Sequence, residues 1–129
     1  MKTNLFFLLL IFSSVALSEP LKVVFHINEF EKANLLIFSI NELIHAKSLI
    51  DIKLVMHGSS ILKLSKNDSL RKKFERLMKQ GVEIGVCSQA MMQNKLKPGM
   101  IIDGVNFLTQ GGLIRIIQLQ NQGYRYIKI

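Results

Sequence analysis

Along most of its length the chain alternates short apolar runs of β-strand type with longer segments of helical periodicity. The apolar runs, rich in β-branched and aromatic residues, cover residues 22–27, 52–56, 82–87, 100–107 and 124–129. Between them, apolar residues recur at helical spacing over residues 31–46, 69–80 and 113–122, with a shorter helix or turn at 88–94. This alternation with short connections predicts right-handed crossovers. It therefore predicts a three-layer α/β/α fold, flavodoxin-like in general architecture, around a mostly parallel five-stranded sheet.

Weaker signals mark the ends of these elements. Asn28 or Asn34 could cap the first helix, and the sequence does not decide between them. Asp103 and Gly104 predict a bulge or bend inside the fourth strand. In a parallel sheet, ligands and reactive groups lie outside the carboxyl ends of the strands, so the residues that follow each strand are the first candidates for function.

The N-terminal segment is typical of an export signal rather than of a folded domain. Lys2 supplies a positive charge, and residues 5–12 form an apolar run that is too short to span a bilayer. Ala16 and Ser18 then occupy the small-residue positions that precede a cleavage point.

We therefore predict a signal peptide over residues 1–18, cleaved between Ser18 and Glu19. The expected mature protein is a single α/β domain over residues 19–129, periplasmic or secreted and free of the membrane after cleavage. An uncleaved anchor is the alternative reading of the same segment.

Composition and charge limit the classes of function. The chain is 49% hydrophobic and only 20% charged, which favours a packed core over disorder. Its formal net charge of +8 would suit nucleic acid, a membrane surface or an acidic partner, but export argues against nucleic acid. Solubility alone also explains the excess charge. The basic run over residues 63–79 is accordingly interpreted as a solvated helix face, with docking of an acidic partner as the alternative.

Cys87 is the only cysteine, and it closes the third predicted strand where a short helix is expected to begin. A thiol at such a junction faces unpaired backbone N–H groups, which favour the thiolate. One cysteine cannot form an internal disulfide or a CxxC redox motif. Cys87 is therefore buried and inert, paired between chains, or retained for chemistry.

Three histidines are scattered along the chain. His57 follows the second strand at the edge where Cys87 is expected, so it could serve as a base if the two strands adjoin. His26 lies inside the first strand and is interpreted as a core residue with its hydrogen bonds satisfied, while His45 is expected at or near the surface. This spacing matches no zinc motif, so we predict neither a metal site nor a cofactor.

A polar turn over residues 109–112 precedes the last helix. Its backbone N–H groups could hold an anion, or its glycines could simply permit a tight turn. The lysine and the spacing of a phosphate loop are absent from it.

Several stretches together resemble the DsrE/DsrF-like family, in its small single-domain branch. They are Lys-Val-Val-Phe-His-Ile at 22–27, Met-His-Gly at 56–58, Lys-Gln-Gly-Val-Glu-Ile-Gly-Val-Cys at 79–87 and Gln-Asn-Gln-Gly-Tyr-Arg-Tyr-Ile-Lys at 120–128. The resemblance implies a three-layer α/β fold assembled as a homo-oligomer, commonly a trimer or hexamer. It also implies that a cysteine carries sulfur as a persulfide, as some members do in sulfur oxidation or tRNA thiolation.

In this chain the resemblance transfers the persulfide role to Cys87, by its place after the third strand, and involves His57 only through the His-Gly turn. The leading hypothesis is an exported sulfur carrier or relay component, exchanging sulfur with donor and acceptor proteins. Such a protein is at most transferase-like and needs no metal or organic cofactor. The alternatives are a non-enzymatic module that binds a small ligand or a partner, with Cys87 structural, and an assembly protein built through its helix faces.

Overall fold

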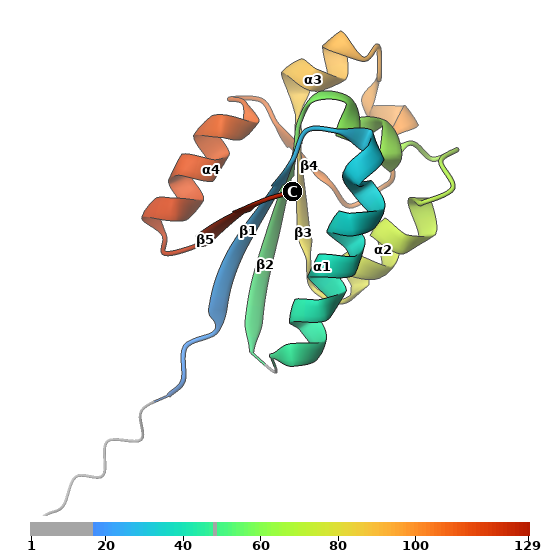
Figure 1. Cartoon of the computed structure of the whole chain (residues 1–129). Helices are drawn as coiled ribbons and strands as arrows, with labels where there is room; N and C mark the ends of the chain where they lie inside the picture. Colours follow the sequence, from blue (N-terminus) through green and yellow to red (C-terminus); the bar gives the residue numbers. More distant parts are fainter. Residues whose placement is uncertain (1–16, 48) are drawn as a thin grey trace, which may run out of the picture.

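In the computed structural model, residues 17–47 and 49–129 form one sheet covered by helices on both faces (Figure 1). The strands run in the order β4-β3-β2-β1-β5, and every pairing is parallel. Their bounds are β1 Leu21–Ile27, β2 Ile50–Met56, β3 Glu83–Cys87, β4 Asn106–Leu108 and β5 Arg125–Lys128. The predicted three-layer α/β fold is confirmed, and its sheet is entirely parallel. Most of the predicted signal peptide, residues 1–16, lies outside the described residues.

Helices α1 (Ala33–Ala46) and α2 (Arg71–Lys79) cover one face of the sheet, and α4 (Gly112–Asn121) covers the other (Figure 1). The short helix α3 (Ser88–Gln93) lies at the carboxyl edge of the strands. Three 3-10 turns, η1 (Phe30–Lys32), η2 (Gly58–Leu64) and η3 (Pro98–Met100), complete the connections. Within the described part of the chain, no helix is long and apolar enough to cross a membrane.

The two faces of the sheet differ in how much apolar surface they bury. The face under α1 and α2 carries the larger core, in which Phe25, Leu36, Ile40, Phe74 and Leu77 are buried almost completely. These residues follow the predicted strand and helix periods, so burial of their apolar surface stabilises both helices on the sheet.

On the opposite face, five buried residues form a narrow apolar belt beneath α4. They are Val24, Val55, Ile116, Leu119 and Tyr124. The belt covers only the middle of this face, and polar side chains occupy the face on either side of it.

Two local predictions were wrong. The fourth strand is limited to Asn106–Leu108, because Pro98–Met100 forms a 3-10 turn and Ile101 instead makes an antiparallel bridge with Ser65. Neither Asn28 nor Asn34 caps α1. The turn η1 leads directly into the helix with Lys32 at the N-cap position, and no side chain caps the helix there.

Candidate functional site

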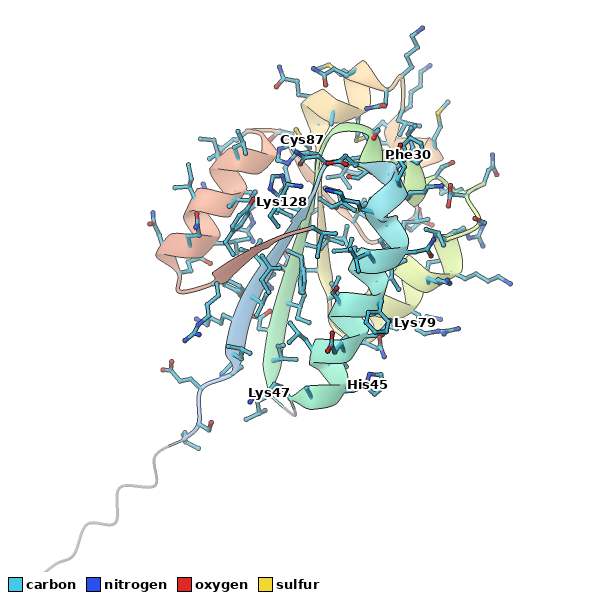
Figure 2. The ribbon with its side chains drawn as sticks, in the orientation of Figure 1. Phe30, His45, Lys47, Lys79, Cys87 and Lys128 are labelled. Carbon is cyan, nitrogen blue, oxygen red and sulfur yellow. The ribbon has the colours of Figure 1, made fainter. Side chains whose placement is uncertain are left out.

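Cys87 ends β3 at the carboxyl edge of the sheet and occupies the N-cap position of α3. Figure 2 shows Cys87 at the opposite end of the molecule from His45 and Lys47. Only 4% of Cys87 is exposed, and it forms no disulfide. The expected position of Cys87 at the carboxyl edge of the sheet is therefore confirmed, while most of its surface is covered by protein.

His57 lies beside Cys87 because β2 and β3 are neighbours in the sheet. The last residue pair between these strands is Met56 with Val86; His57 follows Met56 directly after β2 ends, and Cys87 follows Val86 as the last residue of β3. Side chains alternate along a strand, so His57 projects on the same face as Val55, the face that α4 covers. Together, His57 and Cys87 line a cleft of about 400 Å³, whose other walls come from α3 and residues 110–114.

Glycine at position 112 sets how closely α4 approaches the histidine. A Cβ atom built on Gly112 would overlap Cε1 and Nε2 of His57 and would lie 3.0 Å from Cγ1 of Val55. The absence of a side chain thus lets the first turn of α4 pack directly against the imidazole edge. The polar turn of residues 109–112 has this packing role, and part of it also lines the cleft.

The imidazole of His57 is the inner end of a chain of three hydrogen-bonded side chains. Its Nδ1 lies 2.8 Å from Nε2 of His26, and Nδ1 of His26 lies 2.7 Å from the hydroxyl oxygen of Tyr126. The two imidazoles meet edge to face, with ring centroids 4.8 Å apart. We refer to Tyr126, His26 and His57 as the histidine chain.

Both histidines of this chain are held in the neutral form near neutral pH. Burial, together with the charges of His57 and Lys128, lowers the pKa of His26 from its usual 6.5 to about 4. Burial also lowers the pKa of His57. Each neutral ring carries one proton and one lone pair, so every ring can both donate and accept within the chain.

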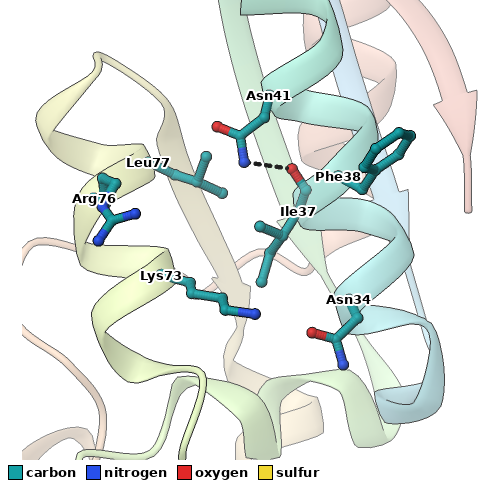
Figure 3. A pocket seen from close by; sticks show the side chains of 7 residues that line it. All are labelled: Asn34, Ile37, Phe38, Asn41, Lys73, Arg76 and Leu77. Atoms are coloured by element: carbon teal, nitrogen blue, oxygen red, sulfur yellow. Dashed lines mark hydrogen bonds between the residues drawn. The ribbon is translucent and has the colours of Figure 1, made fainter.

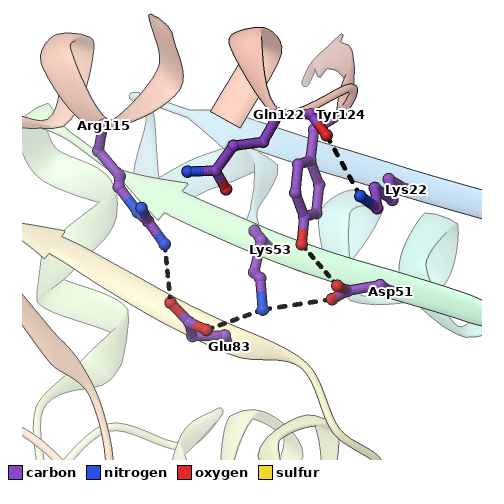
Figure 4. A network of polar contacts seen from close by, with 7 residues as sticks. All are labelled: Lys22, Asp51, Lys53, Glu83, Arg115, Gln122 and Tyr124. Atoms are coloured by element: carbon purple, nitrogen blue, oxygen red, sulfur yellow. Dashed lines mark hydrogen bonds and ion pairs between the residues drawn. The ribbon is translucent and has the colours of Figure 1, made fainter. Parts of the chain in front are cut away.

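A second polar cluster lies on the same face of the sheet, beyond the apolar belt (Figure 4). Lys53 forms ion pairs with Glu83 at 2.8 Å and with Asp51 at 3.3 Å. Arg115 of α4 reaches Glu83 at 3.3 Å, and the Tyr124 hydroxyl donates to Asp51. We call these five residues the charged cluster; it connects β2, β3, α4 and the start of β5.

The pKa values of the charged cluster follow from its pairing. Burial alone would lower the pKa of Lys53, but hydrogen bonds to Glu83 and Asp51 raise it. Burial alone would raise the pKa of Glu83, but Lys53 and Arg115 hold it below its usual value. Lys53 and Glu83 are therefore both held in their charged forms at neutral pH and compensate one another, as in a structural network.

Another hollow, of about 290 Å³, lies between α1 and α2 (Figure 3). It is lined by Asn34, Ile37, Phe38, Asn41, Lys73, Arg76 and Leu77. The Asn41 amide donates to the Ile37 carbonyl, which satisfies a polar group already within α1. The wall of this hollow contains neither the thiol nor an imidazole, so the cleft at Cys87 is the better candidate site.

The structure thus brings together Cys87 and His57, the two residues selected from the sequence. His26 is buried and hydrogen-bonded, which confirms its interpretation as a satisfied core residue, but its link from Tyr126 to His57 was not predicted. The alternation of side chains along a strand could have indicated it: His26 is two residues from Val24, so it lies on the α4 face with His57. Among the described residues, no group of three or more His, Cys, Asp and Glu side chains is arranged to hold a metal ion.

Comparisons with known proteins agree with this architecture. Residues 21–129 match the model of the DsrE/DsrF-like family. A protein of unknown function, MTH1491 from Methanobacterium thermoautotrophicum, superposes with a TM-score of 0.79 at 23% identity, covering 84% of this chain and 99% of its own. The ychN protein from E. coli gives a TM-score of 0.68 at 16% identity, covering 84% and 100%. At these identities the two structures support the fold alone, and no curated protein matches.

Proposed function

The chain belongs to the DsrE/DsrF-like family, and from this membership and the cleft we propose that it is an exported sulfur carrier, holding sulfur as a persulfide on Cys87. The observation that carries the proposal is the position of the thiol. The only cysteine lies at the carboxyl edge of a parallel sheet, in the wall of a cleft that it shares with an imidazole.

The surroundings of Cys87 suit a bound sulfane sulfur. A persulfide is easily lost to other thiols, and the 96% of the residue that is covered restricts their access. The cleft of about 400 Å³ leaves room for the added sulfur and for one end of a donor. The first turn of α4 also lines the cleft, and the N-terminal end of a helix favours an anion such as a persulfide.

The proposed reaction is thiol exchange without net oxidation. The Cys87 thiolate attacks the outer sulfur of a donor persulfide, and a new S–S bond forms. The donor's own S–S bond breaks, and the donor thiolate leaves with the electron pair. An acceptor thiolate then attacks the outer sulfur on Cys87 and restores the original thiolate. The sulfur is transferred at constant oxidation state, so the cycle needs no further oxidant or reductant.

Incubation with a small persulfide donor, followed by intact mass, tests this role. We expect the protein to gain one sulfur atom that a thiol acceptor removes, and we expect C87S to gain none. Graded labelling of the folded protein with a thiol reagent measures access in parallel. If Cys87 reacts only after denaturation and takes up no sulfur, the carrier role is excluded.

The burial of Cys87 favours one alternative, a non-enzymatic α/β module that binds a small ligand or partner in the same cleft. In that case the thiol is a packing group, and C87A would bind the ligand or partner as the unchanged protein does. The sulfur-loading experiment separates the two functions, because only the carrier role makes sulfur uptake depend on position 87.

A further inference from the structure

We propose that Tyr126, His26 and His57 form a proton relay between the outer surface of β5 and the Cys87 cleft. In this relay His57 exchanges the proton in the cleft, while His26 and Tyr126 act through His57 by carrying protons between it and the surface. The inference rests on the proposed function, because the relay serves the ionisation of the thiol that sulfur exchange requires.

The geometry leaves one nitrogen available on the cleft side. His26 uses both of its ring nitrogens inside the chain, one toward Tyr126 at 2.7 Å and one toward His57 at 2.8 Å. His57 uses Nδ1 for His26, and its Cε1–Nε2 edge packs against Gly112, which is itself part of the cleft wall. His57 Nε2 is therefore the atom through which the chain reaches the cleft.

Two neutral arrangements of protons satisfy these hydrogen bonds. In the first, the Tyr126 hydroxyl donates to His26 Nδ1, His26 Nε2 donates to His57 Nδ1, and His57 carries its proton on Nε2. In the second, His57 Nδ1 donates to His26 Nε2 and His26 Nδ1 donates to the Tyr126 oxygen. His57 Nε2 then presents a lone pair to the cleft. The structure fits both arrangements, since a hydroxyl and a neutral imidazole each donate and accept.

Conversion of the second arrangement into the first moves one proton from the cleft to solvent at Tyr126. Starting from the second arrangement, His57 Nε2 takes up a proton that the Cys87 thiol releases into the cleft that both residues line, and His57 passes its Nδ1 proton to His26. His26 passes its Nδ1 proton to the Tyr126 oxygen, and the original hydroxyl proton of Tyr126 leaves to solvent. The chain ends in the first arrangement, uncharged, and the thiolate remains in the cleft.

The histidine chain connects a buried thiol to an exposed tyrosine, so it would give the thiol a route for protons to solvent. Cys87 is 4% exposed and His26 is 6% exposed, so neither has ready access to bulk solvent. Tyr126, by contrast, is 42% exposed and gives the chain a surface terminus. The low pKa of His26, with His57 and Lys128 as its charged or titratable neighbours, also disfavours trapping a proton midway. A relay through neutral groups suits a buried thiol for these reasons.

The substitution Tyr126→Phe tests the relay with little expected harm to the fold, because the ring remains and only the hydroxyl is removed. Tyr124→Phe is the matched control: it removes one hydroxyl from the same strand segment, but that hydroxyl donates to Asp51 in the charged cluster. The measurement is the single-turnover rate of sulfur transfer from glutathione persulfide to Cys87. It is made across neutral pH in ordinary and in deuterated water.

We expect Y126F to slow sulfur loading about tenfold at the acid end of the range, to reduce the solvent isotope effect and to steepen the rise of the rate with pH. Added imidazole buffer should restore part of the rate in His57→Ala, because the cleft can admit it as an external base. Y124F should leave rate, isotope effect and pH profile unchanged.

Equal pH profiles and isotope effects in Y126F and the unchanged protein would overturn the relay, as would an equal slowing by Y124F. Either result leaves the carrier role standing as long as Cys87 still gains sulfur. If the unchanged protein gains no sulfur, the proposed function fails instead, and the relay fails with it as a device for sulfur exchange.

Discussion

The two polar clusters on the α4 face differ in charge although both lie on the same face of one sheet. In the charged cluster, Lys53, Glu83 and Asp51 pair with opposite charges and remain partly exposed, between 19% and 36% in their side chains. In the histidine chain, His26 is buried and hydrogen-bonded only to neutral partners. The apolar belt lies between the two clusters.

The two ends of this sheet face differ in their capacity to exchange protons. Paired charges fix their own protonation states, so the charged cluster connects α4 and β5 to the sheet but has no proton to exchange near neutral pH. Neutral imidazoles keep both a proton and a lone pair, so the histidine chain can exchange protons. The histidine chain lies at the end where the strands finish, which is the general position of sites in parallel sheets.

The two clusters should differ most in how their contribution to the free energy of unfolding changes at acid pH. Because the folded protein holds the pKa of His26 near 4 and the unfolded chain returns it to 6.5, the unfolded state binds more protons between these values. Stability is therefore complete above pH 6.5 and falls by about 3 kcal/mol as pH drops to 4. The free energy of unfolding, measured by denaturant titration at several pH values, checks this.

The exposed residue His45 offers a control for that experiment. H26Q should remove the part of the acid dependence between pH 6.5 and 4 that His26 contributes and leave the part due to His57, whereas H45Q should leave the whole dependence intact. Glu83, whose pKa is lowered, contributes its stability above its usual 4.5 and loses it only below that pH, so it cannot produce the earlier loss. A flat profile in the unchanged protein would show that the histidines are not held neutral by burial.

Gly112→Ala should have the next largest effect and should act at the histidine chain and the neighbouring Val55, away from the charged cluster. The added methyl group would overlap the His57 ring and crowd Val55, so either the imidazole or the first turn of α4 must move. We expect a loss of about 2 kcal/mol in the free energy of unfolding, as for an overpacked core, together with slower sulfur loading.

Gly99→Ala is the matched control, because a Cβ atom at Gly99 would have no heavy atom within 4 Å. It should change neither the stability nor the loading rate. Unchanged stability and loading in G112A would contradict the close packing of His57 against α4.

The fold was predictable from the sequence because its signals are local. The strand and helix periods of residues such as Val82–Cys87 and Leu70–Leu77 depend only on near neighbours, and their apolar stripes are buried as expected. The fourth strand was predicted too long, since residues 100–105 have apolar composition but pair outside the sheet, through the bridge of Ile101 to Ser65. Composition does not indicate where a chain finds its hydrogen-bond partner.

The site was predictable only in part, for a reason of topology. Cys87 closes one predicted strand and His57 follows another, so the sequence alone placed both at one edge. Their adjacency required the strand order, in which β2 and β3 are neighbours. The link to Tyr126 required the further pairing of β1 with β5, the last strand of the chain, which is distant in sequence and not implied by any motif.

Glu83→Gln should give the smallest of the expected changes, and it tests whether the charged cluster has only a structural role. The amide keeps the shape of the side chain but leaves Lys53 with Asp51 alone and Arg115 without its carboxylate. Because the side chain is 36% exposed, solvent screens the loss, and we expect about 1 kcal/mol in the free energy of unfolding, less at high salt. Denaturant titration at low and high salt measures it.

In E83Q, the rate of sulfur loading is more informative than the free energy of unfolding. If the charged cluster only holds α4 and β5 in place, sulfur loading and its pH profile should be the same as in the unchanged protein. A shifted profile would mean that charge at Glu83 is felt by the histidines across Val24 and Val55. The apolar belt would then not insulate the two clusters, and the acid dependence would have to be assigned to both together.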